Sequence, residues 1–242
     1  MLIGEMAWVD VEEYLKKDDR IIVVIGSCEQ HGKHLPLSTD SIIPLELAKI
    51  VSKKTGVPVL PPLNFGMSLH HMGFPGTVSL APQTLSQVFT EILSALFTHG
   101  FRRIMVLNGH GGNIAPMTSA LSVLLNEQKE LSIKVFSWWT DDEVKKLEVE
   151  FFGEADHHAS ACETSVVAFL RPELVRLDRA ASTREVKGSF YCSGAEFRGK
   201  YPFGAVGTDP ARARKECGEK VVSAILEKYV RELEDWLHEP RV

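Results

Sequence analysis

The run Ile21-Ile-Val-Val-Ile25-Gly26 is the clearest guide to the architecture of this chain. A short series of β-branched residues is typical of a strand buried on both faces of a parallel sheet. Comparable runs occur at residues 57–60, 103–107 and 133–136. All four are predicted to be strands, although prolines weaken the second because proline donates no backbone hydrogen bond.

Apolar residues recur at helical spacing between these runs, over residues 41–54, 82–98 and 114–129, and again from Val222 to Leu237. Gly56 and Gly100 follow the first two helices as expected C-caps. Strands that alternate with helices pair in parallel through right-handed crossovers. We therefore predict one α/β domain over residues 1–242, a three-layer α/β/α sandwich with a mainly parallel central sheet. Residues 183–210 are expected to form an irregular excursion, a candidate lid or subunit contact.

Charge and composition exclude several classes of protein. The formal charge of −5, from 27 basic and 32 acidic residues, predicts no nucleic-acid partner. No apolar run is long enough to span a bilayer, and the N-terminus has no basic region followed by an apolar one, so no membrane partner is expected. The four cysteines form no CxxC pair, which argues against a disulfide framework and for a cytoplasmic location.

Potential metal ligands follow the first strand, in Gly26-Ser-Cys-Glu29-Gln-His31-Gly-Lys-His34-Leu-Pro-Leu-Ser-Thr-Asp40. Glu29 and His31 are two residues apart, so they share a side of an extended segment. Two carboxylates and an imidazole suit Zn²⁺, Mn²⁺ or Fe²⁺. Asp40 directly precedes a helix, however, and an N-cap is the competing interpretation. His34 is expected to pack or hydrogen-bond rather than to bind a metal.

The third strand ends in Asn108-Gly-His110-Gly-Gly-Asn113. Because the carboxyl ends of parallel strands meet at one edge of the sheet, His110 is expected on the same edge as Glu29. A phosphate-binding loop is the rival interpretation, but the segment has neither GxGxxG nor the lysine of a P-loop. His110 therefore favours a metal site.

The segment Asp156-His157-His158-Ala-Ser-Ala-Cys-Glu163 offers a general acid or base and one more ligand. His157 and His158 point in different directions, so at most one serves the chemistry. Glu163 is predicted in the first turn of a helix, where the helix dipole also favours a carboxylate. Cys162 is a poor nucleophile because a neighbouring carboxylate disfavours its thiolate.

Together with Phe74-Pro-Gly-Thr77 and Gly204-x-Val-Gly-x-Asp209-Pro210, these segments resemble the creatininase family of metal-dependent amidohydrolases over nearly the whole chain. The resemblance implies one or two divalent cations, with Glu29 and His110 on one, His31 on the other and Asp40 between them. It makes His158 the catalytic proton carrier. Creatininase proper has a further glutamate ligand where this chain has Gly112. Either Glu163 supplies the missing ligand, or the second metal site is weaker.

The resemblance also bears on the substrate. Creatininase proper has aromatic residues where this chain has Gly111 and Glu154, whereas Trp139 matches an active-site tryptophan. His71 and Lys33 are further candidate substrate contacts, the lysine for an anionic group. We expect hydrolysis of a non-peptide C–N bond in a formamide or cyclic amide by metal-activated water, with Glu163 as ligand or catalytic group.

Several alternatives remain open. Within the family, they are deformylation of a formylamino-pyrimidine ribonucleotide in riboflavin or deazaflavin biosynthesis, creatinine hydrolysis, and peptidase-like maturation of a cofactor precursor. Outside it, they are a phosphoesterase, a Rossmann-type nucleotide binder and an inactive metal-binding scaffold. The family also predicts a homo-oligomer, expected to be a hexamer.

Overall fold

A three-stranded parallel sheet forms the centre of the molecule in this computed structural model, which describes residues 1–186, 188 and 190–239. The strands β1 (Arg20–Ile25), β2 (Arg103–Asn108) and β3 (Ser132–Ser137) lie in that order. Ile25 pairs with Asn108 and Asn108 with Ser137, so all three carboxyl ends reach the same edge. Three of the four predicted strands are thereby confirmed.

The fourth predicted strand, residues 57–60, does not form as a regular strand. The segment follows the outer edge of β1 but makes only isolated bridges, which join Val59 to Ile22 and Leu63 to Ile25. Ile22 donates to the Pro58 carbonyl at 2.9 Å, and Leu60 donates back to Ile22 at 2.8 Å. The prediction located the segment correctly and was wrong about its regularity, because its prolines cannot continue a hydrogen-bonded ladder.

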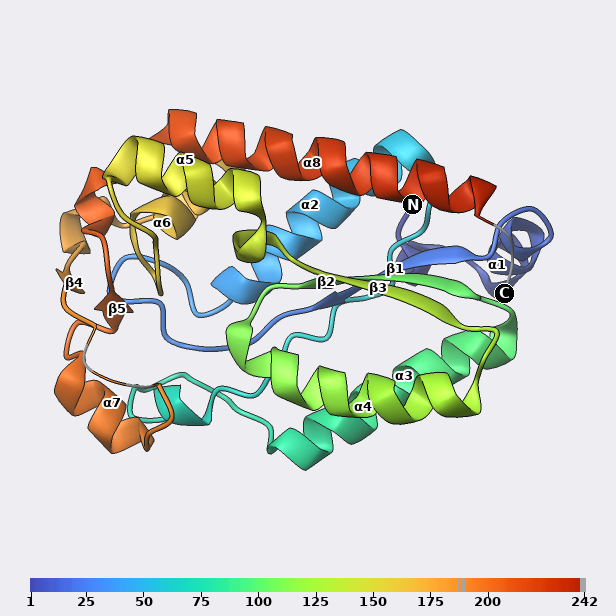
Figure 1. Cartoon of the computed structure of the whole chain (residues 1–242), viewed down its shortest axis with the longest axis horizontal. Helices are drawn as coiled ribbons and strands as arrows, with labels where there is room; N and C mark the ends of the chain where they lie inside the picture. Colours follow the sequence, from blue (N-terminus) through green and yellow to red (C-terminus); the bar gives the residue numbers. More distant parts are fainter. Residues whose placement is uncertain (187, 189, 240–242) are drawn as a thin grey trace.

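Helices cover both faces of the sheet (Figure 1). One face carries α2 (Thr39–Thr55), α5 (Asp142–Phe152), α6 (Ala161–Leu170) and α8 (Lys215–His238), and the other carries α1 (Trp8–Leu15), α3 (Pro82–His99) and α4 (Ile114–Glu127). Alternate residues of β1 serve the two cores: Ile22 and Val24 face the first group, whereas Ile21 and Val23 face the second. The predicted three-layer α/β/α architecture is confirmed.

The excursion at residues 183–210 is more ordered than the sequence predicted. It contains α7 (Gly194–Lys200) and β5 (Ala205–Val206), and β5 pairs in parallel with β4 (Ser182–Thr183). Phe197 and Tyr201 are buried in a small core of their own. Residues 187 and 189 lie outside the described residues.

Short 3₁₀ turns complete the structure, at Ile3–Glu5, Leu69–His71, Gly111–Asn113, Trp138–Thr140, Pro172–Leu174, Leu177–Arg179 and Pro210–Arg212. As predicted, α2 and α3 end at Gly56 and Gly100, both with the left-handed backbone that glycine favours.

Across the part of the chain that is described, no helix combines the length and apolar character needed to cross a membrane.

Two glycines allow the start of α2 to approach the sheet edge closely. A Cβ atom on Gly109 would lie 1.8 Å from the carbonyl oxygen of Asp40, and one on Gly26 would lie 2.7 Å from the same atom. Such contacts are impossible for any residue with a side chain. The glycines at the ends of β1 and β2 therefore bring Asp40 to the edge where the strands end.

We predict that Gly109→Ala pushes α2 away from the sheet and lowers the free energy of unfolding by about 1–3 kcal/mol, as overpacked sites do. Urea unfolding followed by circular dichroism measures this change. The matched control is Gly199→Ala in α7, where an added Cβ meets no heavy atom within 4 Å. Equal stability of both variants and the wild type would contradict the close-approach argument.

Candidate active site

The carboxyl edge of the sheet gathers four of the predicted ligands in one buried cluster. Glu29 and His31 come from the loop after β1, Asp40 from the first turn of α2, and His110 from the end of β2. Their exposures are 1%, 1%, 3% and 5%, respectively. Ionisable groups are rarely buried this completely unless they are paired or hold a metal.

The ligand atoms form two groups that share Asp40. Oδ2 of Asp40 lies 3.1 Å from Nδ1 of His110, which lies 3.2 Å from Oε2 of Glu29. Oδ1 of Asp40 lies 3.0 Å from Nε2 of His31, which lies 3.6 Å from Oε1 of Glu163. Within each group, the three ligand atoms lie within 4.8 Å of one another. Asp40 thus offers one oxygen to each group.

Several of these atoms lack an ordinary partner. Oε2 of Glu29, Nε2 of His31 and Oδ2 of Asp40 are buried and have no hydrogen-bond partner among the residues that the structure describes. Leaving a buried polar atom unsatisfied costs about 1–3 kcal/mol. Carboxylate oxygens and imidazole nitrogens together are the ligands that zinc, manganese and iron accept. The cluster therefore fits divalent cations.

Backbone carbonyls determine which nitrogen of each of the two histidines faces the carboxylates. Nδ1 of His31 donates to the carbonyl of Glu29 at 3.1 Å, which turns Nε2 toward Asp40 and Glu163. Nε2 of His110 donates to the carbonyl of Met67 at 3.0 Å, which turns Nδ1 toward Glu29 and Asp40. This is the usual way in which a protein orients a ligating histidine.

The charges in the cluster are strongly coupled. Burial opposes protonation of both histidines, but the carboxylates of Asp40 and Glu163 raise the pKa of His31 well above its usual value. Glu29 and Asp40 do the same for the pKa of His110. Burial also disfavours ionised Asp40, but the two histidines outweigh it and lower the pKa of that carboxyl. The carboxylates thus favour positive charge at both rings, a preference that a bound divalent cation would also satisfy.

The N-cap interpretation of Asp40 is wrong. Helix α2 begins at Thr39 after Ser38, and no side chain caps its N-terminus. Both carboxylate oxygens of Asp40 instead face histidines.

The predicted proton carrier, His158, lies beside this cluster. Its Nδ1 atom is 3.8 Å from Oε1 of Glu29, and its ring stands 4.6 Å from that of His31. A two-way backbone pairing with Val206 holds the residue in place. Burial lowers the pKa of His158 to about 3, with His31 adding to the effect, so the ring is neutral at pH 7. The adjacent His157 instead packs against Gly207, as the opposed directions of the pair predicted.

His71 is part of the same cluster rather than a surface residue. It is buried, and its Nε2 atom lies 3.5 Å from Oε1 of Glu29. Burial, followed by the nearby His158, lowers the pKa of His71 well below its usual value. The alternative of an exposed loop histidine is therefore wrong.

The remaining candidates are more dispersed. Trp139 lies beside Gly111, whose added Cβ would be 4.0 Å from the indole, whereas Trp138 is buried in the core. Lys33 is exposed, with its ammonium 5.5 Å from the centre of the Phe203 ring. His34 shares a hydrogen bond of 3.0 Å with Thr164, in agreement with its predicted role.

Cysteine chemistry plays no part in this cluster. All four cysteines are free, so no disulfide framework forms. Cys162 is fully buried, and a hydrogen bond with Cys217 together with burial raises the pKa of its thiol well above the usual value. A thiol that resists ionisation is not a nucleophile.

Two supporting residues were missed in the sequence. Gln30 contacts both His71 and His158 through its side chain. Its position between the predicted ligands Glu29 and His31 was the signal in the sequence that could have identified it. Asp156 accepts hydrogen bonds from the backbone of Cys162 at 2.7 Å and Glu163 at 3.3 Å, and so holds the start of α6. Its signal was an aspartate just ahead of a predicted helix.

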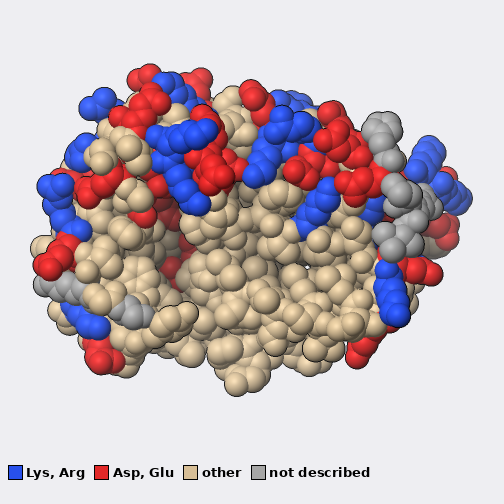
Figure 2. Space-filling view, in the orientation of Figure 1, with Lys and Arg blue, Asp and Glu red and all other residues tan. Residues whose placement is uncertain are grey.

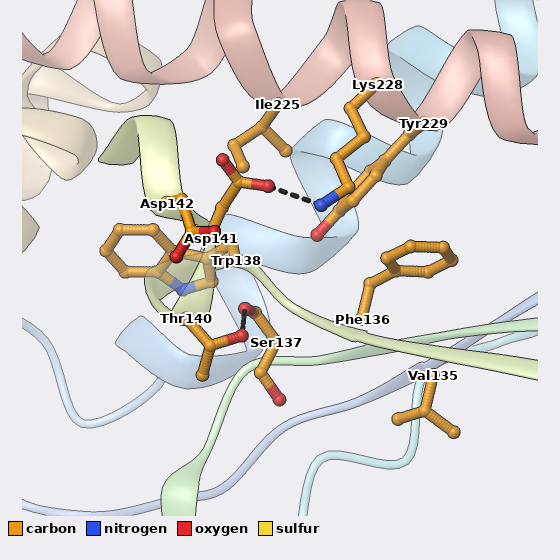
Figure 3. Close-up of a pocket in the computed structure, with 10 residues that line it drawn as sticks. All are labelled: Val135, Phe136, Ser137, Trp138, Thr140, Asp141, Asp142, Ile225, Lys228 and Tyr229. Carbon is orange, nitrogen blue, oxygen red and sulfur yellow. Dashed lines mark hydrogen bonds and ion pairs between the residues drawn. The ribbon is translucent and has the colours of Figure 1, made fainter. Parts of the chain in front are cut away.

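A separate cavity of about 280 Å³ lies between β3, the turn after it and α8 (Figure 3). Lys228 reaches across it to Asp141 at 2.5 Å, next to Phe136 and Tyr229. None of the predicted site residues is among the described residues that line this cavity. The candidate active site is therefore the buried cluster and not the cavity.

Carboxylate and imidazole groups that share one aspartate, at the carboxyl edge of a parallel sheet, are the arrangement expected of a metal-dependent hydrolase. The family model described as creatinine amidohydrolase matches residues 4–233. The chain therefore belongs to the creatininase family and is a metal-dependent amide hydrolase.

Individual relatives agree with this assignment. The creatinine amidohydrolase of Pseudomonas putida is 30% identical over 74% of this chain and 75% of its own length. The mycofactocin precursor peptide peptidase of Mycolicibacterium smegmatis is 35% identical over 65% of this chain, which spans 60% of that relative. A solved creatininase with manganese superimposes with a TM-score of 0.83 at 27% identity, over 97% of both chains.

The surroundings of Gly112 leave no room for a glutamate at that position. An added Cβ would lie 2.1 Å from the carbonyl oxygen of Met67 and 2.4 Å from Nε2 of His110. A side chain there would break the hydrogen bond between these two groups. The group around His31 includes Glu163 instead.

We predict that Gly112→Ala displaces the His110 ring and at least halves the bound metal, measured by elemental analysis after zinc loading and desalting. Gly111→Ala is the matched control, because its added Cβ has only Trp139 nearby, at 4.0 Å. Full metal content in the Gly112 variant would contradict the steric argument.

Proposed function

We propose that the chain hydrolyses a non-peptide C–N bond in a small amide, either a formamide or a cyclic amide. The observation that carries this proposal is the position of Asp40, whose two oxygens serve two groups of ligand atoms. Two cations close together are a recurrent device for hydrolysing amides and esters.

We assign the ligands from the contacts described above. Glu29, His110 and Asp40 would hold one divalent cation, and His31, Asp40 and Glu163 the other. Zinc, manganese and iron all suit these donors. Such cations supply Lewis acidity, which activates water and polarises the amide carbonyl.

The chain's own residues supply proton transfer and orientation. His158 is neutral and faces the cluster through Nδ1, so it is placed to take a proton from water and deliver it to the leaving nitrogen. Glu163 is held by the backbone N–H of Ala159, which donates to its Oε2 atom at 2.8 Å and leaves Oε1 for the cluster. We therefore give Glu163 a ligand role rather than that of a general acid.

Substrate contacts are proposed for Trp139 and Lys33. Gly111 leaves open space beside Trp139, which favours a substrate larger than a single small ring. Lys33 is exposed beside Phe203, within reach of solvent, and its positive charge suits an anionic group, which keeps a formylamino-pyrimidine ribonucleotide among the candidates. His71 faces Glu29 and Gln30, and we propose that it supports Glu29 rather than facing the substrate.

A substrate screen with metal analysis tests the proposal. The purified protein is incubated with formanilide, creatinine, simple lactams, a dipeptide and a phosphate monoester. We expect one or two divalent cations per chain and release of amine or formate from an amide. Phosphate release alone would establish a phosphoesterase, and a protein without metal or turnover would be a scaffold.

His110→Ala removes a ligand and is predicted to strip metal from its group and abolish turnover. Elemental analysis and the amide assay measure both effects. Full activity in this variant would refute the ligand assignment.

His158→Ala is predicted to keep its metal and to lower kcat by roughly 10²–10⁴, the range for losing a general acid–base group. His157→Ala is the matched control, because this neighbour packs against Gly207. Loss of metal in the His158 variant would make that residue a ligand.

We further propose that residues 1–242 act as one catalytic unit in a cytoplasmic homo-oligomer, expected to be a hexamer. Charged side chains of both signs mix over α5 and α8, which fits the expected absence of a nucleic-acid partner (Figure 2). The face formed by α3 and α4 is nearly free of charge (Figure 2), and Ile114 and Val123 are exposed on α4. Such a face favours subunit contact.

A further inference from the structure

We propose that Gln30 sets the proton positions on His71, through its side-chain amide, and on His158, through its backbone carbonyl, and so makes Nδ1 of His158 the atom that accepts a proton. The catalytic consequence rests on the proposed function, whereas the proton positions follow from hydrogen bonding alone. Gln30 is buried, and its amide nitrogen lies 2.9 Å from one nitrogen of each ring.

Two backbone groups determine which way the amide points. Oε1 of Gln30 accepts a hydrogen bond from the backbone N–H of Gly32 at 3.0 Å. Nε2 of Gln30 donates to the carbonyl of Gly204 at 3.1 Å. A backbone N–H only donates and a carbonyl only accepts, so exchanging the two amide atoms would break both bonds.

The orientation of the amide determines the tautomer of His71. Its Nδ1 atom lies 2.9 Å from Nε2 of Gln30, which is a donor, so Nδ1 must accept. The proton of the neutral ring therefore sits on Nε2, 3.5 Å from Oε1 of Glu29. His71 turns an N–H toward the carboxylate that we assign as a ligand.

The backbone carbonyl of Gln30 decides the tautomer of His158, because it lies 3.0 Å from Nε2 of that ring and can only accept. The two hydrogens on the amide nitrogen of Gln30 then go to the Gly204 carbonyl and to His71. None remains for Nε2 of His158, although that atom is only 2.9 Å away. Nε2 must carry its own proton, which it donates to the backbone carbonyl of Gln30 at 3.0 Å. Nδ1 is then left unprotonated.

The unprotonated atom faces the chemistry, because Nδ1 of His158 lies on the side of Glu29. Its opposite nitrogen stays bonded to a backbone carbonyl, as a positioned general base requires. Gly204 makes room for this arrangement: an added Cβ would lie 2.0 Å from Oε1 of Gln30, and the φ angle of +82° also favours glycine. Gln30 is thus a positioning residue for both histidines.

The test measures tautomers directly, by nitrogen-15 magnetic resonance of the zinc-loaded, histidine-labelled full chain at pH 7. His71→Gln and His158→Gln variants assign the signals. In the wild type we expect protonated Nε2 on both rings. In Gln30→Met the His71 signals should shift, because their donor is gone, while zinc content stays unchanged.

Kinetics supply the second measurement, with formanilide and creatinine as probes. Gln30→Met should lower kcat by roughly 10–100-fold, the usual effect of losing such a supporting hydrogen bond, and leave KM nearly unchanged. The matched control is Gln87→Met, on the exposed side of α3, where the side-chain amide donates to Glu91 at 2.8 Å. Gln30→Glu replaces Gln30→Met if the latter fails to fold, and should move the His71 proton to Nδ1.

Each result bears on a different step. A proton on Nδ1 of either ring in the wild type, unchanged His71 signals in Gln30→Met, or loss of zinc from that variant would overturn the proposal. Shifted signals with wild-type kcat would overturn its catalytic consequence. If the wild type hydrolyses no amide, the proposed function fails, and the tautomers are still decided by the spectra.

Discussion

The site depends on the close approach of α2 to the carboxyl edge of the sheet. Gly26 and Gly109 have no Cβ, so the backbone of Asp40 lies against the ends of β1 and β2. From there its carboxylate reaches histidines from two different segments. A side chain at either glycine would separate Asp40 from its partners and leave two incomplete groups of ligand atoms.

Around this contact, neutral hydrogen-bonding groups orient the charged ones. Carbonyls of Glu29 and Met67 aim the nitrogens of His31 and His110. Asp156 holds the N-terminus of α6, from which Glu163 reaches the cluster. Burial makes these partners effective, because a hydrogen bond in a low-dielectric interior is stronger and an unmet one is costly.

How far sequence patterns succeeded depended on the range of the interactions involved. The β-branched run at β1 and the glycines after α2 and α3 report local conformational preferences, so these elements were predicted closely. Residues 57–60 were harder, because their pairing with β1 competes with the proline inside the segment and those that follow it. The N-cap interpretation of Asp40 failed because capping is a local preference, whereas its contacts with His31 and His110 are not.

The sequence by itself determined the α/β class, the order of the strands along the chain and the identities of the clustered carboxylates and histidines, because periodicity and residue chemistry are local properties. Only the tertiary structure decided that Glu163 joins the His31 group, that no side chain fits at position 112, and that Gln30 orients two histidines. These facts depend on distances between segments as far apart as Gln30 and Gly204, and such distances exist only after the layers have packed.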